Sequence, residues 1–130
     1  MIKFTLKLRP TSEWGMNKVY AGKHWSERKK QAAVVHLMVR AAIKKQIRPV
    51  QMFQKSVTVT ILYNSRLDID NHGYLAKMII DGMKGLLIQD DSRKYVDCMM
   101  QGFHAGNPEE IYVYVENSEN GGISWINRKS

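Results

Sequence analysis

The chain has 130 residues, of which 44% are hydrophobic, and its 20 lysines and arginines against 12 acids give a formal net charge of +8. This length is typical of one domain with its own core, and no apolar run approaches the roughly 20 residues that span a bilayer. The single cysteine, Cys98, excludes an internal disulfide, so we expect a soluble, cytoplasmic protein with a reduced thiol. The positive charge makes nucleic acid the expected macromolecular partner.

The first half of the chain predicts one strand and one long helix. Apolar and polar residues alternate over residues 2–9, which is typical of a half-buried strand, and Pro10 ends it. Residues 11–25 have the composition of a loop. Ser26 is the expected N-cap of a helix that continues to Ile47. The apolar stripe expected on this helix consists of Ala33, Val34, Leu37, Met38 and Ala41.

The second half predicts a strand over residues 55–63, a helix over 70–86, and two further strands over 95–103 and 111–116. The apolar stripe expected on this helix consists of Leu75, Met78, Ile79, Gly82, Met83 and Leu86. The order β-α-β-α-β-β indicates an α+β domain in which a small mixed β-sheet packs with two main helices. We assign residues 1–116 to this domain. Residues 117–130 are expected to form a polar C-terminal tail, in which Trp125 and Ile126 could dock on the domain.

Acidic residues cluster in one segment of this basic chain. Five of the twelve acids lie within residues 68–91, namely Asp68, Asp70, Asp81, Asp90 and Asp91. Carboxylates crowded in this way repel one another unless a cation lies among them. Three carboxylates that converge from a strand end, a helix start and a loop would supply the oxygen ligands that Mg²⁺ prefers. Because such a metal can activate water and stabilise a phosphodiester transition state, the pattern predicts a metal-dependent nuclease.

Each acidic element also has an ordinary structural explanation. Residues 68–71 could cap a helix, residues 90–92 could form a turn, and Lys77 and Asp81 could form an i,i+4 ion pair worth about 0.2–0.5 kcal/mol. A calcium-binding EF-hand is excluded because Ile79 occupies the position that needs a bidentate glutamate. Separate caps and turns do not explain why these acids occur together on a basic chain.

The acidic segment resembles the motif of the RusA family of Holliday-junction resolvases, which are crossover junction endodeoxyribonucleases. The similar residues are Asp68, Asp70, Asn71, Lys77, Asp81, Gly85, Asp90 and Asp91, and a weaker similarity at the start of the chain involves Pro10, Ser12, Asn17 and Tyr20. The resemblance spans about residues 1–115. It implies a small α+β homodimer, common in bacteria and prophages, that cuts four-way DNA junctions during recombination and repair. The implied cofactor is Mg²⁺, with Mn²⁺ as a substitute.

The resemblance also implies roles for individual residues. Asp68, Asp70 and Asp91 are expected to bind the metal and, together with Lys77, to be catalytic. The supporting residues are expected to be Asp90, Asp81 and Asn71, with Asp81 orienting Lys77.

One departure from the family pattern concerns the lysine. Five residues separate Asn71 from Lys77 here, where the family has two. The three extra residues are just under one helical turn, so Lys77 keeps nearly the same face but moves by about 4.5 Å. Either the site has an extra turn or the helix starts later, near Gly73, and Lys84 is an alternative to Lys77.

Basic and aromatic residues are expected to form the DNA-binding surface, because neutralising phosphates releases counterions. The basic candidates are Lys23, Arg28, Lys29, Lys30, Lys44, Lys45, Lys84, Arg93 and Lys94. Trp14, Tyr20 and Trp25 could stack on unpaired bases or pack in the core or a dimer interface, which we favour for Trp25. Two alternatives to a junction endonuclease remain: a non-catalytic DNA-binding accessory protein, and a nuclease that acts on other branched nucleic acids.

Overall fold

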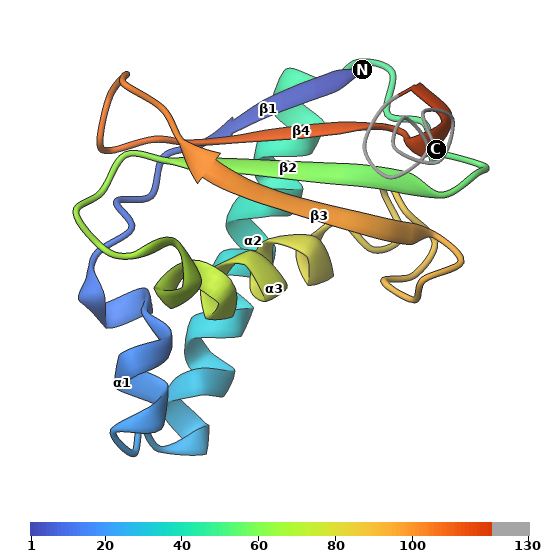
Figure 1. Cartoon of the computed structure of the whole chain (residues 1–130). Coiled ribbons are helices and arrows are strands. Elements are labelled where there is room, and N and C mark those ends of the chain that lie inside the picture. Colours follow the sequence, from blue (N-terminus) through green and yellow to red (C-terminus); the bar gives the residue numbers. More distant parts are fainter. Residues whose placement is uncertain (121–130) are drawn as a thin grey trace, which may run out of the picture.

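A four-stranded mixed β-sheet covers two helices in the computed structural model, which describes residues 1–120 (Figure 1). The strands are β1 (Ile2–Leu6), β2 (Val57–Tyr63), β3 (Val96–Phe103) and β4 (Ile111–Asn117), in the spatial order β1-β4-β2-β3. Strand β4 is antiparallel to both β1 and β2, whereas β3 is parallel to β2. Strands β1, β2 and β3 therefore all end at the same edge of the sheet.

Both predicted helices are present, and the structure adds a short helix within residues 11–25, which were expected to form a loop. A short 3₁₀ turn, η1 (Ser12–Trp14), and α1 (Met16–Tyr20) precede the long helix α2 (Trp25–Gln46). A second 3₁₀ turn, η2 (Ile69–His72), leads directly into α3 (Gly73–Gly82), and η3 (Ser118–Asn120) follows β4. The predicted α+β class and the element order are confirmed. Among the described helices, none is both long and apolar enough to cross a membrane.

The core lies between the sheet and the helices because each element is apolar on one side. Along β4, Ile111, Val113 and Val115 are buried, whereas the residues between them are only partly buried, which is the alternation of a sheet with one covered face. Helix α3 buries the predicted apolar stripe, including Leu75 and Ile79.

The predicted apolar stripe of α2 is wrong. The residues that α2 buries are Val35, Val39 and Ile43, whereas Leu37 is 71% exposed. Apolar residues occur around much of this helix, so the sequence does not show which side faces the core. The side is decided by packing against α3 and β1. The N-cap is also different, because the residue at that position is His24, whose Nδ1 accepts a hydrogen bond from the Ser26 backbone N–H.

Several predicted boundaries change. Helix α3 begins at Gly73, the later of the two starts considered above, and it ends at Gly82 rather than at residue 86. Strand β1 ends at Leu6 rather than at residue 9. At the other end, β4 reaches Asn117, and the buried Ser118 contacts Thr58 and Asp97. Residues 117 and 118 therefore belong to the folded domain, while the expected docking residues Trp125 and Ile126 lie outside the described part of the chain.

The close approach of α2 and α3 depends on Gly82. A Cβ atom at residue 82 would lie 2.9 Å from Val39 Cβ and 3.3 Å from the backbone of His36. We expect Gly82→Ala to lower the free energy of unfolding by about 1–3 kcal/mol, because the helices must move apart. The control is Gly73→Ala in the same helix, where the nearest atom is 3.8 Å away. Urea denaturation that gave both variants the same stability would contradict this packing.

Candidate functional site

The topology places the acidic residues at the two ends of α3. Asp68 and Asp70 follow β2, at the edge where β2 ends. Asp90 and Asp91 precede β3 and therefore lie toward the opposite edge, because β3 is parallel to β2. Helix α3 has ten residues and connects the two groups over about 15 Å (Figure 1).

Asp68 and Asp70 present unpaired carboxylates at the surface. Both residues are exposed, and within residues 1–120 neither side chain makes a hydrogen bond or ion pair. Asp68 occupies the N-cap position of η2, but its side chain does not cap the turn. The capping explanation for Asp68 is therefore wrong, and its carboxylate oxygens are available to a ligand.

Asn71 joins the acidic segment to the start of the chain. This side chain is 93% buried, and its Oδ1 accepts a hydrogen bond of 2.8 Å from the Asn17 backbone N–H. A Cβ atom at Gly15 would lie 2.8 Å from the same amide group, so only glycine allows this close approach. Asn71 therefore links the acidic segment to the start of the chain, which brings together the two segments that carry the family resemblance.

His72 anchors the acidic loop from inside, and sequence analysis did not select it. The ring is fully buried and stacks on Tyr63 at 4.0 Å. Its Nε2 lies 2.7 Å from Ser65 Oγ, which in turn accepts a hydrogen bond from the Leu67 backbone N–H. Burial lowers the pKa of His72, which favours the neutral ring. No spacing pattern marks this residue in the sequence, because its partners come from β2 and the following loop.

The second acidic group is organised by Lys84. Its Nζ atom lies 3.2 Å from Asp91 Oδ1 and 3.4 Å from Asp81 Oδ1, while Lys77 Nζ lies 3.5 Å from Asp81 Oδ2. Burial opposes the charge of Lys84, but the hydrogen bonds and charges of Asp91 and Asp81 outweigh it and raise the pKa of Lys84. The neighbouring Asp81 carboxyl, and then Lys84 and Asp90, outweigh burial and lower the pKa of Asp91. Lys84, the alternative to Lys77, is thus the lysine in contact with Asp91.

A cavity of about 230 Å³ extends along α3 between the two acidic groups. It reaches from Gly73, three residues after Asp70, to the Asp81–Asp91 pair. Lys77 also lines it, with a side chain that is 73% exposed. The full lining is Gly73, Lys77, Ile80, Asp81, Asp91, Val96 and Met99.

The structure does not gather the three predicted metal ligands. Within residues 1–120, no three carboxylate, imidazole or thiol side chains lie close enough to hold one metal ion. The expected convergence of Asp68, Asp70 and Asp91 is absent because α3 separates the first two from the third. Their donor chemistry still fits Mg²⁺, which usually takes one or two protein carboxylates together with water and substrate phosphate.

Most of the predicted DNA-binding residues lie at the surface, with two exceptions. Lys23 donates hydrogen bonds to the Glu13 carbonyl and to Gln31, so it has a structural role. Lys84 holds the acidic pair. Trp25 is 61% exposed and is not part of the core, whereas Trp14 packs partly against it. The exposed candidates are Arg28, Lys29, Lys30, Lys44, Lys45, Arg93, Lys94 and the aromatic Tyr20.

Comparison with known proteins finds one family. The model of the family described as endodeoxyribonuclease RusA matches residues 12–116. Neither the curated proteins nor the solved structures contain a significant match to this chain.

The contacts of Lys84 predict a change in the titration of Asp91. We expect Lys84→Gln to raise the pKa of Asp91, because the variant removes a hydrogen bond and a positive charge that favour the carboxylate. A ¹³C NMR titration of the side-chain carboxyl in metal-free protein measures this pKa. Lys77→Gln is the matched control, since Lys77 pairs with Asp81 alone. Equal pKa shifts in the two variants would refute the assignment.

Proposed function

The chain belongs to the endodeoxyribonuclease RusA family, and we propose that it is a Mg²⁺-dependent enzyme that resolves four-way DNA junctions in recombination and repair. The observation that carries the metal dependence is the pair Asp68 and Asp70. Two carboxylates, two residues apart, remain exposed and unpaired on a basic protein. Such a pair costs electrostatic energy unless a cation binds to it.

The proposed metal ligands are Asp68 and Asp70, because Asp91 lies at the other end of α3. A divalent cation at this position would supply Lewis-acid stabilisation of the phosphodiester and a metal-bound water as nucleophile. The protein contributes the orientation of the carboxylates. Buried Asn71 and His72 follow these carboxylates and hold the loop through contacts with Asn17 and Ser65, so little entropy is lost when a substrate binds.

The lysines would act on the substrate phosphate. The ammonium group of Lys77 is largely exposed on the cavity along α3, where it can stabilise negative charge that develops on the phosphate during cleavage. The neighbouring Asp81 and then Lys84 favour the charged form of the Asp91 carboxylate and lower its pKa. The positions of Lys77 and Asp91 on the cavity along α3 support the proposal that this cavity and the Asp68–Asp70 pair belong to one active site.

Junction resolution also supports a homodimer and an extended DNA surface. A four-way junction offers two symmetrically related strands, and a two-fold symmetric pair of subunits matches that symmetry. The exposed lysines and arginines of α2, together with Arg93 and Lys94, would hold the junction arms by their phosphates.

The catalytic assignment is tested by Asp70→Asn. We expect this variant to reduce cleavage of a synthetic four-way junction about a hundredfold or more. Junction binding should remain or become tighter, because a negative charge near phosphate is removed. Glu27→Gln removes the same charge from the exposed start of α2 and should cut at the wild-type rate. Normal cleavage by Asp70→Asn would show that Asp70 is not catalytic.

Metal dependence and substrate class need a separate assay. Purified protein is incubated with a four-way junction, a three-way junction or a linear duplex, with Mg²⁺ or with EDTA. We expect rapid cleavage of the four-way junction with Mg²⁺ alone. Binding without cleavage would favour the non-catalytic accessory protein, and preferential cutting of the three-way junction would favour a nuclease for other branched DNA.

A further inference from the structure

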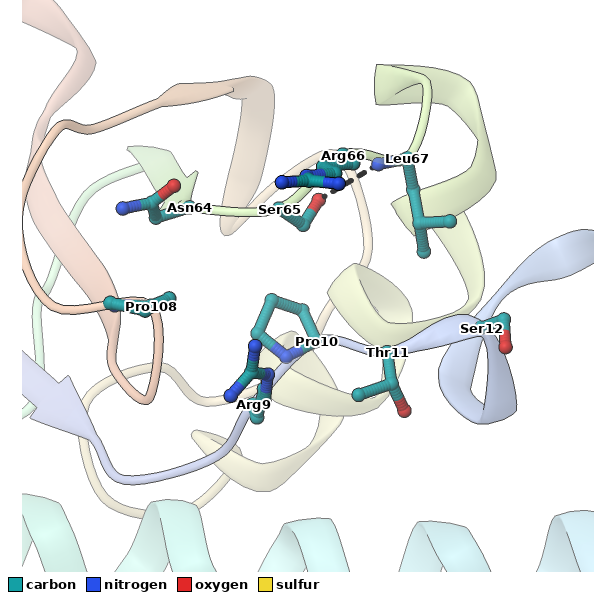
Figure 2. A pocket seen from close by; sticks show the side chains of 9 residues that line it. All are labelled: Arg9, Pro10, Thr11, Ser12, Asn64, Ser65, Arg66, Leu67 and Pro108. Atoms are coloured by element: carbon teal, nitrogen blue, oxygen red, sulfur yellow. Dashed lines mark hydrogen bonds between the residues drawn. The ribbon is translucent and has the colours of Figure 1, made fainter.

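A second cavity, beyond the ends of β1 and β2, is separate from the cavity along α3. Its volume is about 700 Å³, within the range of small-ligand sites. Two chain segments form most of it: one follows β1 and the other follows β2. These segments meet because β1 and β2 end at the same edge of the sheet. Figure 2 shows the nine lining residues, which are Arg9, Pro10, Thr11, Ser12, Asn64, Ser65, Arg66, Leu67 and Pro108.

The lining is suited to an anion. It contains two guanidinium groups, hydroxyl groups and one side-chain amide, but no carboxylate. Arg9 and Arg66 come from the two different segments and lie on facing sides of the cavity (Figure 2). Within residues 1–120, Arg66 makes no ion pair. Guanidinium groups bind phosphate oxygens well because their donors match the geometry of the anion.

Within residues 1–120, Arg9 forms one ion pair, and its partner Glu109 lies outside the cavity lining. Its Nη1 atom is 2.7 Å from Glu109 Oε1, and both side chains are more than half exposed. An exposed ion pair of this kind contributes about 0–1 kcal/mol, so a phosphate can displace Glu109. The loop that carries Glu109 is held near β2 by a hydrogen bond of 2.6 Å from Asn64 Nδ2 to the Gly106 carbonyl.

The cavity adjoins the acidic loop directly. Leu67 lines the cavity and immediately precedes Asp68 in the chain. Ser65, another lining residue, contacts His72, which anchors the same loop. A nucleotide in the cavity would therefore lie within about one to three nucleotides of a phosphate at Asp68, given a rise of about 3.4 Å per nucleotide along a strand.

We propose that this cavity binds one nucleotide of the DNA strand that is cut, with its backbone phosphate between Arg9 and Arg66. Glu109 occupies Arg9 in the DNA-free protein and is displaced when the phosphate enters. The proposal rests on the proposed junction-cutting function and adds a binding subsite to it. None of the basic residues selected from the sequence lines this cavity.

Binding of a fluorescein-labelled four-way junction, measured by anisotropy in EDTA, tests the subsite without cleavage. We expect Arg9→Gln and Arg66→Gln each to weaken binding about three- to tenfold and to reduce the salt dependence by about one counterion. The matched control is Lys55→Gln, which removes a cation from another exposed ion pair, about 20 Å away at the other end of β2. This control should change the affinity less than twofold. Thermal melts establish that every variant is folded.

Glu109→Gln tests the competition at Arg9. We expect this variant to bind the junction about two- to fivefold more tightly, the equivalent of an exposed ion pair. The gain should disappear in the Arg9→Gln background, because Glu109 acts through Arg9. An equal gain in both backgrounds would show that Glu109 acts only through its overall charge.

Junctions in which one backbone phosphate is replaced by a neutral methylphosphonate locate the phosphate that binds between Arg9 and Arg66. A substitution within three nucleotides of the cut should weaken binding by wild-type protein but not by Arg66→Gln. If wild type cuts junctions while Arg9→Gln and Arg66→Gln bind like Lys55→Gln, the subsite is overturned and the proposed function stands. If wild type neither binds nor cuts a junction, both proposals fail.

Discussion

The parallel pairing of β2 with β3 is the constraint on which the arrangement of the site depends. Parallel neighbours cannot be joined by a tight turn, so the chain must cross the sheet between them. Helix α3 makes this crossing, and it carries the chain from the Asp68–Asp70 loop to the Asp90–Asp91 turn. One acidic segment in sequence therefore becomes two acidic groups in space. The cavity along α3, with Lys77 on its wall, lies between them.

Buried polar contacts hold the exposed acids in place. The Asp68–Asp70 loop has no apolar stripe of its own, yet the residues that follow it, Asn71 and His72, are both buried. Asn71 accepts a hydrogen bond from the backbone at the start of α1, and His72 contacts Tyr63 and Ser65. Breaking such contacts leaves desolvated groups without partners, which costs about 1–3 kcal/mol each. The carboxylates of the loop thus stay at the surface, while the residues that follow them are held in place by buried contacts.

The cavity that precedes this loop and the carboxylates of the loop itself carry opposite charge. Upstream, the cavity that contains Arg9 and Arg66 is lined by cations and hydroxyl groups, and the carboxylate of Glu109 holds Arg9 only through an exposed ion pair. Downstream, the carboxylates Asp68 and Asp70 have no cationic partner within the described residues. A DNA strand that passes from one to the other would meet fixed positive charge first and the two exposed carboxylates next. This order suits a substrate that is itself a polyanion.

The sequence by itself determined the class of fold, the α3 stripe around Leu75 and Ile79, and the acidic motif, because these depend on local periodicity and spacing. It did not determine the buried side of α2, where Val35 and Val39 pack and Leu37 does not, because apolar residues surround that helix. Only the tertiary structure separated Asp91 from Asp68 and brought the segment of Arg9 to that of Arg66. The direction in which strands pair is set by contacts between residues far apart in the chain, and no local pattern records it.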